Sequence, residues 1–158
     1  MKVSRLLAVS ASLSFGFLLV GCGRGDASTV ARAQNLSGEN WIIVTKGATW
    51  SPKPAQVLAA REAVHTYLGS LQKTLPKDDY RCRKITEILA NWALYKMQAI
   101  GVPGPGQVRM HLNFLGLSDE TWKRNEIVRV MDGGSQFWNV DFDLNTNLAS
   151  NLEINGDA

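Results

Sequence analysis

Residues 137–143, with the sequence FWNVDFD, alternate apolar and polar side chains and decide the fold that the rest of the chain supports. The apolar positions are Trp138, Val140 and Phe142, and each is followed by an asparagine or an aspartate. Successive side chains of a β-strand point to opposite faces, so this pattern predicts a strand with one buried face. A sheet of this kind needs a second layer to cover its apolar face.

The same period of two recurs before this strand. Residues 95–102 and 108–114 predict two strands joined by a turn at residues 103–106, whose sequence is Pro-Gly-Pro-Gly. Residues 126–131 predict a third strand. A tight hairpin is expected at residues 132–135, Asp-Gly-Gly-Ser, because glycine tolerates the positive φ angles that tight hairpins require.

The chain after residue 143 predicts one more hairpin. Residues 144–147 are rich in asparagine and form the expected turn, and residues 148–155 form the closing strand with Leu152 and Ile154 facing in. Together these segments predict an antiparallel sheet of about four strands.

The stretch before the strands has a helical period. Ser51 supplies an N-cap oxygen, Pro52 is tolerated at the first helical position, and Pro76 ends the helix. Residues 83–92 predict a second, shorter helix. The apolar stripe of the first helix consists of Val57, Ala60, Val64, Leu68, Leu71 and Leu75.

These elements predict an α+β domain, in which an N-terminal helix and a shorter second helix pack on a curved antiparallel sheet. The arrangement resembles small cystatin-like and PepSY-like domains. The sequence at 137–143, followed by Asn145 and Thr146, looks like the strand-turn-strand end of PepSY-type modules, although Asn147 stands where those modules often carry glycine. The resemblance implies a binding or regulatory module of the cell envelope rather than a defined catalytic site.

The first 22 residues have the layout of a secretory signal. Lys2 and Arg5 precede an apolar run at residues 6–20, which is shorter than the ~20 apolar residues of a membrane span. Residues 19–22, Leu-Val-Gly-Cys, resemble the lipobox of bacterial lipoproteins, in which the signal is cut before the cysteine. The resemblance implies that Cys22 carries acyl chains such as palmitate and anchors the protein in a membrane.

This signal also predicts the domain organisation. Residues 1–21 form the signal peptide, residues 22–40 a flexible tether rich in glycine, serine and alanine, and residues 41–158 a single α+β domain. Gly23 follows the lipobox cysteine, and similarity to the sorting of enterobacterial lipoproteins favours the periplasmic face of the outer membrane.

Composition excludes several classes of protein. Cleavage removes two of the 17 basic side chains and none of the 14 acidic ones, so the mature chain is nearly neutral and carries no basic stripe for nucleic acid. With Cys22 acylated, Cys82 has no disulfide partner. No nucleophile elbow, phosphate loop, HExxH or CxxC motif is present, so no cofactor is expected.

One candidate ligand-binding patch lies on a predicted strand. By alternation, His111 falls on the polar face together with Arg109 and Asn113, where the three side chains either bind a ligand or are simply solvated. His65, on the first helix, is expected at the boundary of the apolar stripe.

Carboxylates offer a second candidate site. Asp132 and Glu126 can pair with carboxylates of the next strand, such as Asp141, for acid/base chemistry. Alternatively, Asp132 only bonds the backbone of its turn.

The spacing of Asp141, Asp143 and Asn145 is similar to the opening of a calcium loop. However, Thr146 stands where that loop needs glycine, and a strand that enters a turn explains the same residues, so no metal site is expected.

Two further residue types remain as candidates. Cys82 lies between two arginines, which would favour a thiolate, or it is an inert buried cysteine. Residues 41–44 form either a short strand or an apolar segment laid over the domain. Trp41 and Trp50 lie outside the predicted regular elements, and either one of them covers an apolar opening or meets a partner, or both simply fill the core.

The leading hypothesis is a non-catalytic envelope lipoprotein that binds a protein or a small apolar ligand between helix and sheet. The alternative is a small hydrolase or isomerase with a pocket inside the curved sheet, which uses His111 and either Asp132 or Asp141. A third hypothesis is a structural role in envelope assembly through exposed tryptophans.

Overall fold

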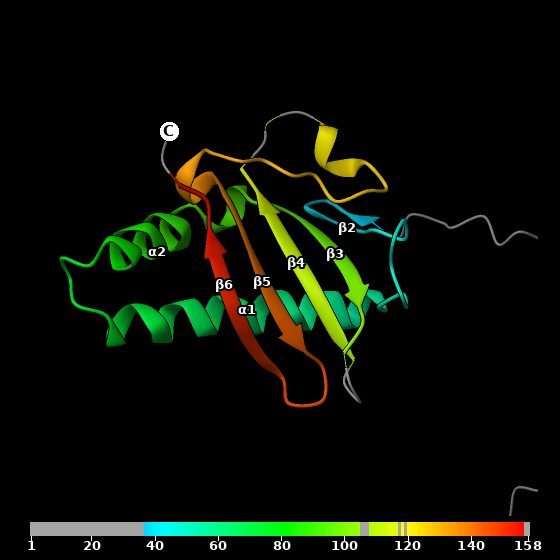
Figure 1. Ribbon diagram of the computed structural model, residues 1–158, viewed down its shortest axis with the longest axis horizontal. Helices are drawn as coiled ribbons and strands as arrows, with labels where there is room; N and C mark the ends of the chain where they lie inside the picture. The colour runs from blue at the N-terminus through cyan, green and yellow to red at the C-terminus, as the bar shows by residue number, and fades with distance from the viewer. Residues whose placement is uncertain (1–36, 105–107, 117, 119, 157–158) are drawn as a thin grey trace, which may run out of the picture. The chain divides into compact units, whose positions relative to one another are not determined.

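The computed structural model describes residues 37–104, 108–116, 118 and 120–156 (Figure 1). The predicted signal peptide, the lipidation residue Cys22 and most of the tether lie outside the described residues. Within the described part of the chain, no helix is both long enough and apolar enough to cross a membrane.

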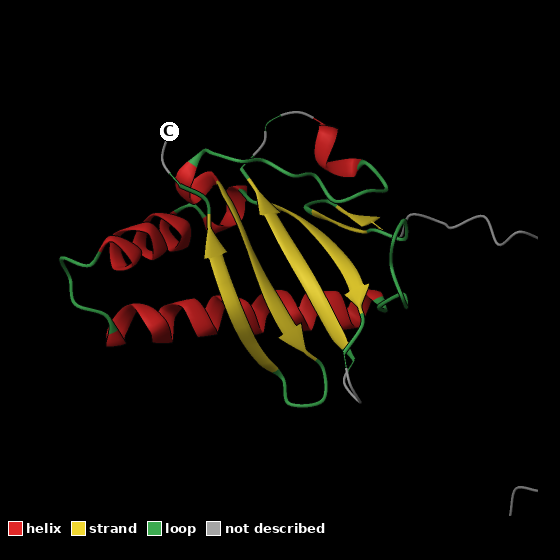
Figure 2. Ribbon diagram, viewed as in Figure 1, coloured by secondary structure: helices red, strands yellow, loops and turns green. Residues whose placement is uncertain are grey.

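Two α-helices precede the main strands in the described chain, as predicted (Figure 2). They are α1 (Pro54–Thr74) and α2 (Tyr80–Ala90), and the short 3-10 helix η1 (Trp92–Leu94) follows them. The helix starts differ from the prediction, because Lys53 is the N-cap of α1 and Asp79 is the N-cap of α2. The Asp79 side chain accepts a hydrogen bond of 2.6 Å from Arg81 N.

One mixed sheet contains all six strands of the described chain, and their spatial order follows their order in sequence. The predicted antiparallel sheet of about four strands is confirmed by the four long strands, which form an antiparallel meander. The strands are β1 (Ser37–Gly38), β2 (Trp41–Ile43), β3 (Lys96–Val102), β4 (Arg109–Leu115), β5 (Phe137–Asp143) and β6 (Leu148–Ile154).

The short strand β2 makes the sheet mixed. It pairs in parallel with β3, with Trp41 opposite Met97 and Ile43 opposite Ala99. Parallel neighbours need a long crossover connection, and here both helices lie in that connection.

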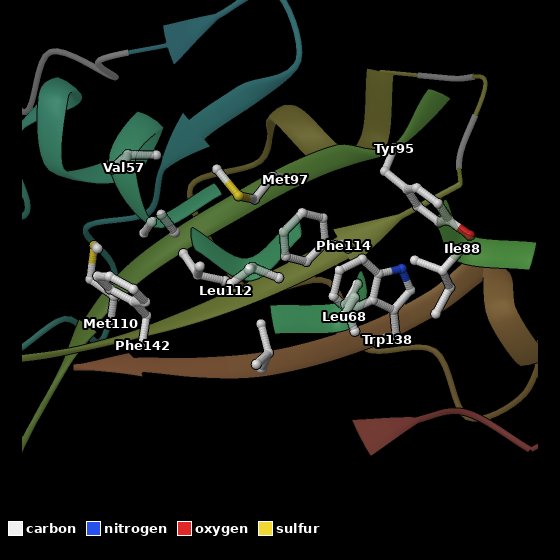
Figure 3. Close-up of a cluster of buried hydrophobic side chains, with 14 of the residues drawn as sticks. Val57, Leu68, Ile88, Tyr95, Met97, Met110, Leu112, Phe114, Trp138 and Phe142 are labelled. Atoms are coloured by element: carbon white, nitrogen blue, oxygen red, sulfur yellow. The ribbon is translucent and has the colours of Figure 1, made fainter. Parts of the chain in front are cut away.

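The helices cover one face of the sheet, which we call the inner face; in Figure 1, α1 crosses behind the long strands. The predicted stripe of α1 is buried there from Val57 to Leu68, and Leu71 and Leu75 are partly buried against the same core. The apolar positions of β4 and β5 face this stripe. At the centre, the rings of Phe114 and Trp138 stack with 3.9 Å between centroids (Figure 3). Leu152 and Ile154 of β6 are partly buried against the same core, as predicted.

The predicted strand at residues 126–131 is wrong. This part of the chain belongs to a segment that we call the strap, residues 120–132, which begins with the 3-10 helix η2 (Glu120–Lys123). The strap pairs with none of the six described strands and forms one isolated bridge, from Asp132 to Gly156. In Figure 1 the strap is the yellow-to-orange segment that passes the ends of β3, β4 and β5. Trp122 of η2 is buried.

The glycines after the strap adopt the positive φ angles that the sequence predicts, with 106° at Gly133 and 54° at Gly134. They do not join two paired strands, however. Gly134 N donates to Gly156 O over 3.0 Å, and the chain continues through the 3-10 helix η3 (Gly134–Gln136) into β5.

Candidate functional site

The face of the sheet opposite the helices, which we call the outer face, carries a second and smaller apolar cluster. Ile100 and Leu115 of the sheet and Trp122 of the strap are buried in it, and Ile127, Val128 and Phe137 pack against it. These contacts hold the strap on the sheet by apolar burial, but they involve few side chains compared with the inner core.

Hydrogen bonds from a buried glutamine fix the strap more specifically. Gln98 of β3 has no exposed surface. Its amide nitrogen donates to the carbonyl oxygens of Trp122 and Glu126, both at 2.9 Å, and its amide oxygen accepts from Val128 N at 2.8 Å. A buried peptide group needs such a partner, and here a side-chain amide takes the place of a neighbouring strand.

Two asparagines continue this pattern along the strap. Asn113 of β4 donates to Val128 O over 2.8 Å, and Asn155, just after β6, donates to the carbonyl oxygens of Val130 and Asp132. The carbonyls held by the three amides all belong to even-numbered strap residues, from Trp122 to Asp132. Residues 122–126 belong to η2 and to the bends that follow it, and this curvature lets the carbonyl oxygens of Trp122, Arg124 and Glu126 converge on the amide nitrogen of Gln98.

The strap is also held on its outside. Asn125 accepts hydrogen bonds from Thr45 N at 2.7 Å and from the Thr45 hydroxyl at 3.0 Å. Lys46 Nζ lies 2.7 Å from a carboxylate oxygen of Glu126, and this bond lowers the pKa of Glu126. Both of these side chains are exposed, so the ion pair adds little to stability.

A cavity of about 460 Å³ lies between the end of the strap and the outer face, and we call it the hollow. Strap residues 127–131 form one wall. The sheet side is partly apolar, with Ile100, Val102 and Phe137, and partly polar, with His111 and Asn139. Met131, whose side chain is 88 % exposed, stands at its edge. An apolar surface interrupted by a few polar groups is typical of ligand sites.

Three polar side chains that line the hollow have no hydrogen-bonding or ionic partner among the described residues. Arg129 comes from the strap, Asn139 from β5 and Glu153 from β6, and Asn139 lies opposite Glu153 in the strand register. A cation, an amide and a carboxylate are therefore free to bind groups of a ligand.

The structure brings together two of the predicted site residues, His111 and Asp141. They lie opposite each other on β4 and β5, and His111 Nδ1 is 3.0 Å from Asp141 Oδ1. Asn151 donates to the other carboxylate oxygen over 2.9 Å. The bond with His111 holds the pKa of Asp141 below its usual value, and Asn151 and the charge of Arg109 act in the same direction against burial. His111 lines the hollow, and Asp141 orients its ring.

The other predicted members of this patch have different roles. Asn113 is buried rather than solvated, because the strap covers it and uses its amide. Asp132 is exposed and forms an isolated bridge with Gly156, so its backbone rather than its carboxylate has the structural role. Glu126 pairs with Lys46 and not with carboxylates of the next strand.

The predicted tryptophans lie away from the hollow. Trp41 and Trp50 are partly buried and pack against the inner core. Trp50 lies directly on Gly101 of β3, where a Cβ atom would stand 2.2 Å from the Trp50 carbonyl oxygen, so only glycine fits. Neither tryptophan forms part of the hollow's wall.

The remaining candidates are placed as follows. Cys82 is buried, with its sulfur 3.8 Å from Gln72 O, and His65 contacts the ring of Trp92 at 4.9 Å between centroids. Asp143 accepts hydrogen bonds from the backbone of Asn145 and Thr146, which stabilises the turn between β5 and β6. Among the described residues, no three His, Cys, Asp or Glu side chains cluster closely enough to hold a metal ion.

The sequence interpretation missed Gln98 and Asn155, which hold the strap, and Asn139, Glu153 and Arg129, which line the hollow. One signal was present for Gln98, since it is a polar residue within the apolar strand 97–102. A polar residue in such a strand indicates a buried hydrogen-bonding role. Nothing comparable marks Asn155.

Comparison of the chain with known protein families, with curated proteins and with solved structures finds no match. The function is therefore argued from the residues and geometry of the site.

Proposed function

We propose that the protein is a lipid-anchored protein of the bacterial cell envelope, at the periplasmic face of the outer membrane, whose α+β domain is a non-catalytic binding module. Its ligand occupies the hollow on the outer face. This placement differs from the site between helix and sheet that the sequence suggested, since the inner face is filled by core side chains.

One observation carries the proposal: the hollow combines an apolar wall with polar groups that have no partner in the described protein. Ile100 and Phe137 offer apolar surface, while Arg129, Asn139 and Glu153 offer one cationic, one amide and one anionic group. Water satisfies these groups in the absence of ligand, and a ligand with matching groups displaces that water.

Filling the hollow tests this placement. The full-length protein in lipid nanodiscs would be screened against a library of small fragments by thermal shift, with empty nanodiscs as the blank. Asn139→Trp fills the hollow from its floor. The control is Ser150→Trp, an exposed position on the neighbouring strand that lies outside the hollow's wall. We expect fragment binding to be lost in the first variant and retained in the second. Equal binding by both variants would place the ligand site elsewhere.

The anchor is tested separately. Cys22→Ser should move the protein from the membrane fraction to the soluble fraction and abolish labelling with radioactive palmitate, because the acyl chains supply the membrane affinity. Cys82→Ser, the matched control, should leave both unchanged since Cys82 is buried in the folded domain. Membrane retention of the Cys22 variant contradicts the lipoprotein proposal.

A small pocket enzyme is the second candidate, and the pairing of His111 with Asp141 favours it. A carboxylate that orients a histidine can prepare the ring for proton transfer in a hydrolase or isomerase. The test is turnover of p-nitrophenyl acetate by the protein and by His111→Ala. Loss of a clear catalytic rate in the variant supports an enzyme, and equal background rates support a binding module.

A further inference from the structure

A row of four polar side chains crosses the outer face of the sheet, one from each long strand. In the strand register Gln98 lies opposite Asn113, Asn113 opposite Asn139, and Asn139 opposite Glu153. The strap covers the first two, which bind its peptide groups, and Asn113 also donates to the Gln98 side chain over 3.2 Å. The last two line the hollow, where neither has a partner among the described residues. The row therefore has one half that the strap occupies and one half that is free for a ligand.

The hollow holds one group of each charge. Among its described lining residues, Arg129 of the strap is the only arginine or lysine, and Glu153 of β6 is the only carboxylate. These two side chains form no ion pair with each other or with another described residue. Both are exposed, so their long side chains are free to converge on a ligand between them. A ligand with a single charge is attracted by one group and repelled by the other, whereas a ligand with both charges is attracted by each.

The charged groups nearby do not compete for these two. Asp141 of the outer face is already bonded to His111. Arg81 of α2 lines a separate and smaller cavity with Glu153, but it forms no ion pair with that carboxylate. Arg129 and Glu153 are therefore the charged groups that a ligand in the hollow would meet.

The apolar part of the hollow determines the rest of the ligand. Ile100 and Val102 of β3 and Phe137 of β5 line it together with the free polar groups. The cavity of about 460 Å³ has room for a small molecule. An aliphatic chain that contacts these side chains would be removed from water, which favours binding.

We infer that the hollow binds a small zwitterion with an apolar body, such as an amino acid with an aliphatic side chain. Glu153 binds the ammonium group, Arg129 binds the carboxylate, and the Asn139 amide, which can both donate and accept, makes a further hydrogen bond beside them. The aliphatic part contacts Ile100 and Phe137. This inference rests on the proposed binding function and specifies the chemical class of the ligand.

Three matched probes test the need for both charges. Norleucine carries an ammonium and a carboxylate, hexanoate lacks the ammonium, and pentylamine lacks the carboxylate. Their affinities would be measured by isothermal titration calorimetry on the full-length protein in nanodiscs of phosphatidylglycerol, a lipid without an ammonium group. We expect norleucine to bind at least about tenfold more tightly than either single-charge probe. Equal affinities for the three probes, or no binding of norleucine, would overturn the inference.

Neutral variants assign each charge to its residue. Glu153→Gln should weaken norleucine binding about tenfold without weakening hexanoate binding, because hexanoate has no ammonium group. Arg129→Gln should weaken norleucine binding by a similar factor without weakening pentylamine binding, because pentylamine has no carboxylate.

Two matched controls remove exposed charges outside the hollow's wall. Glu62→Gln and Arg81→Gln should each leave the affinity for norleucine within about threefold of the wild-type value, since neither residue lines the hollow. Equal losses in the controls and in the hollow variants would contradict the assignment of the charges to Arg129 and Glu153.

The fragment screen separates this inference from the proposed function. Norleucine binding should be lost in Asn139→Trp and retained in Ser150→Trp, as for the fragments. If fragments bind the hollow but norleucine does not, the zwitterion inference is wrong and the proposed function stands. If neither fragments nor norleucine bind, both are wrong.

Discussion

The two faces of the sheet are covered by different means. On the inner face, α1 and α2 present regular apolar stripes, and sixteen buried residues form one continuous core. On the outer face, the strap has little regular structure, five buried residues form the cluster, and the amides of Gln98, Asn113 and Asn155 hold its backbone. Apolar packing therefore dominates the inner face, and specific hydrogen bonds dominate the outer face. The outer face, with the smaller apolar cluster, contains the hollow.

The largest expected effect lies on the inner face. Trp138→Ala should destabilise the protein by about 3–5 kcal/mol, because it leaves a cavity beside the stacked ring of Phe114. Urea denaturation measures the change. Phe137→Ala, on the same strand but facing the strap, should cost less than half as much since its side chain is only partly buried. Similar costs for the two variants would remove the distinction between the faces.

An intermediate effect is expected for the amides of the outer face. Gln98→Leu keeps the size of the side chain but leaves strap carbonyls and Val128 N without partners, and should cost about 1–3 kcal/mol. Hydrogen exchange at Val128 N–H should accelerate, while the exchange of inner-face amides in β5 changes little. Asn139→Leu, also on the outer face, should stay within about 0.5 kcal/mol. Unchanged exchange at Val128 would contradict the role of Gln98.

A smaller effect depends on pH. The pKa of Asp141 is lowered in the folded protein, so its ionised form contributes stability above the ordinary aspartate pKa of about 3.9. That contribution falls as the pH drops through the folded pKa, below about 4. Asp141→Asn should therefore lower stability at pH 6 and flatten the decline below pH 4, as measured by urea midpoints from pH 2 to 7. Parallel profiles for wild type and variant would show that the pair with His111 has no energetic role.

The smallest effect is expected at the exposed ion pair on the outside of the strap. Lys46→Ala should leave the thermal midpoint unchanged in 0.15 M salt, since both side chains are exposed and the pair is screened. Thr45→Val removes the partly buried hydrogen bonds between the Thr45 hydroxyl and the Asn125 side chain, and should lower the thermal midpoint measurably. A larger effect of the lysine change would mean that charge rather than the amides holds the strap.

The inner face could be predicted from the sequence because it depends on periodicity. The stripe from Val57 to Leu68 and the alternation around Trp138 each require a buried face, and only a helix layer on a sheet satisfies both. The predicted α+β class and the long strands followed from this. The parallel pairing of β2 could not be predicted, because the sequence of a three-residue strand does not indicate the strand's direction.

The outer face could not be predicted in the same way. Residues 126–131 have the sequence pattern of a strand, but a sequence pattern does not identify the hydrogen-bonding partner of the segment. Those partners are side-chain amides from three different strands or their ends. Alternation placed His111 and Asp141 on the same face, yet their pairing depends on the register between β4 and β5. The hollow arises only when strap and sheet come together.

The order of strands in the sheet has a consequence for how the protein folds. The hairpin from β5 to β6 closes across residues 144–147, and the one from β3 to β4 across residues 103–108, so both can form early from local contacts. The parallel pairing of β2 with β3 must wait until both helices have formed between them. We therefore expect β2, together with β1 that pairs with it, to dock last and, when the protein is pulled from its N-terminus, to detach before the four long strands.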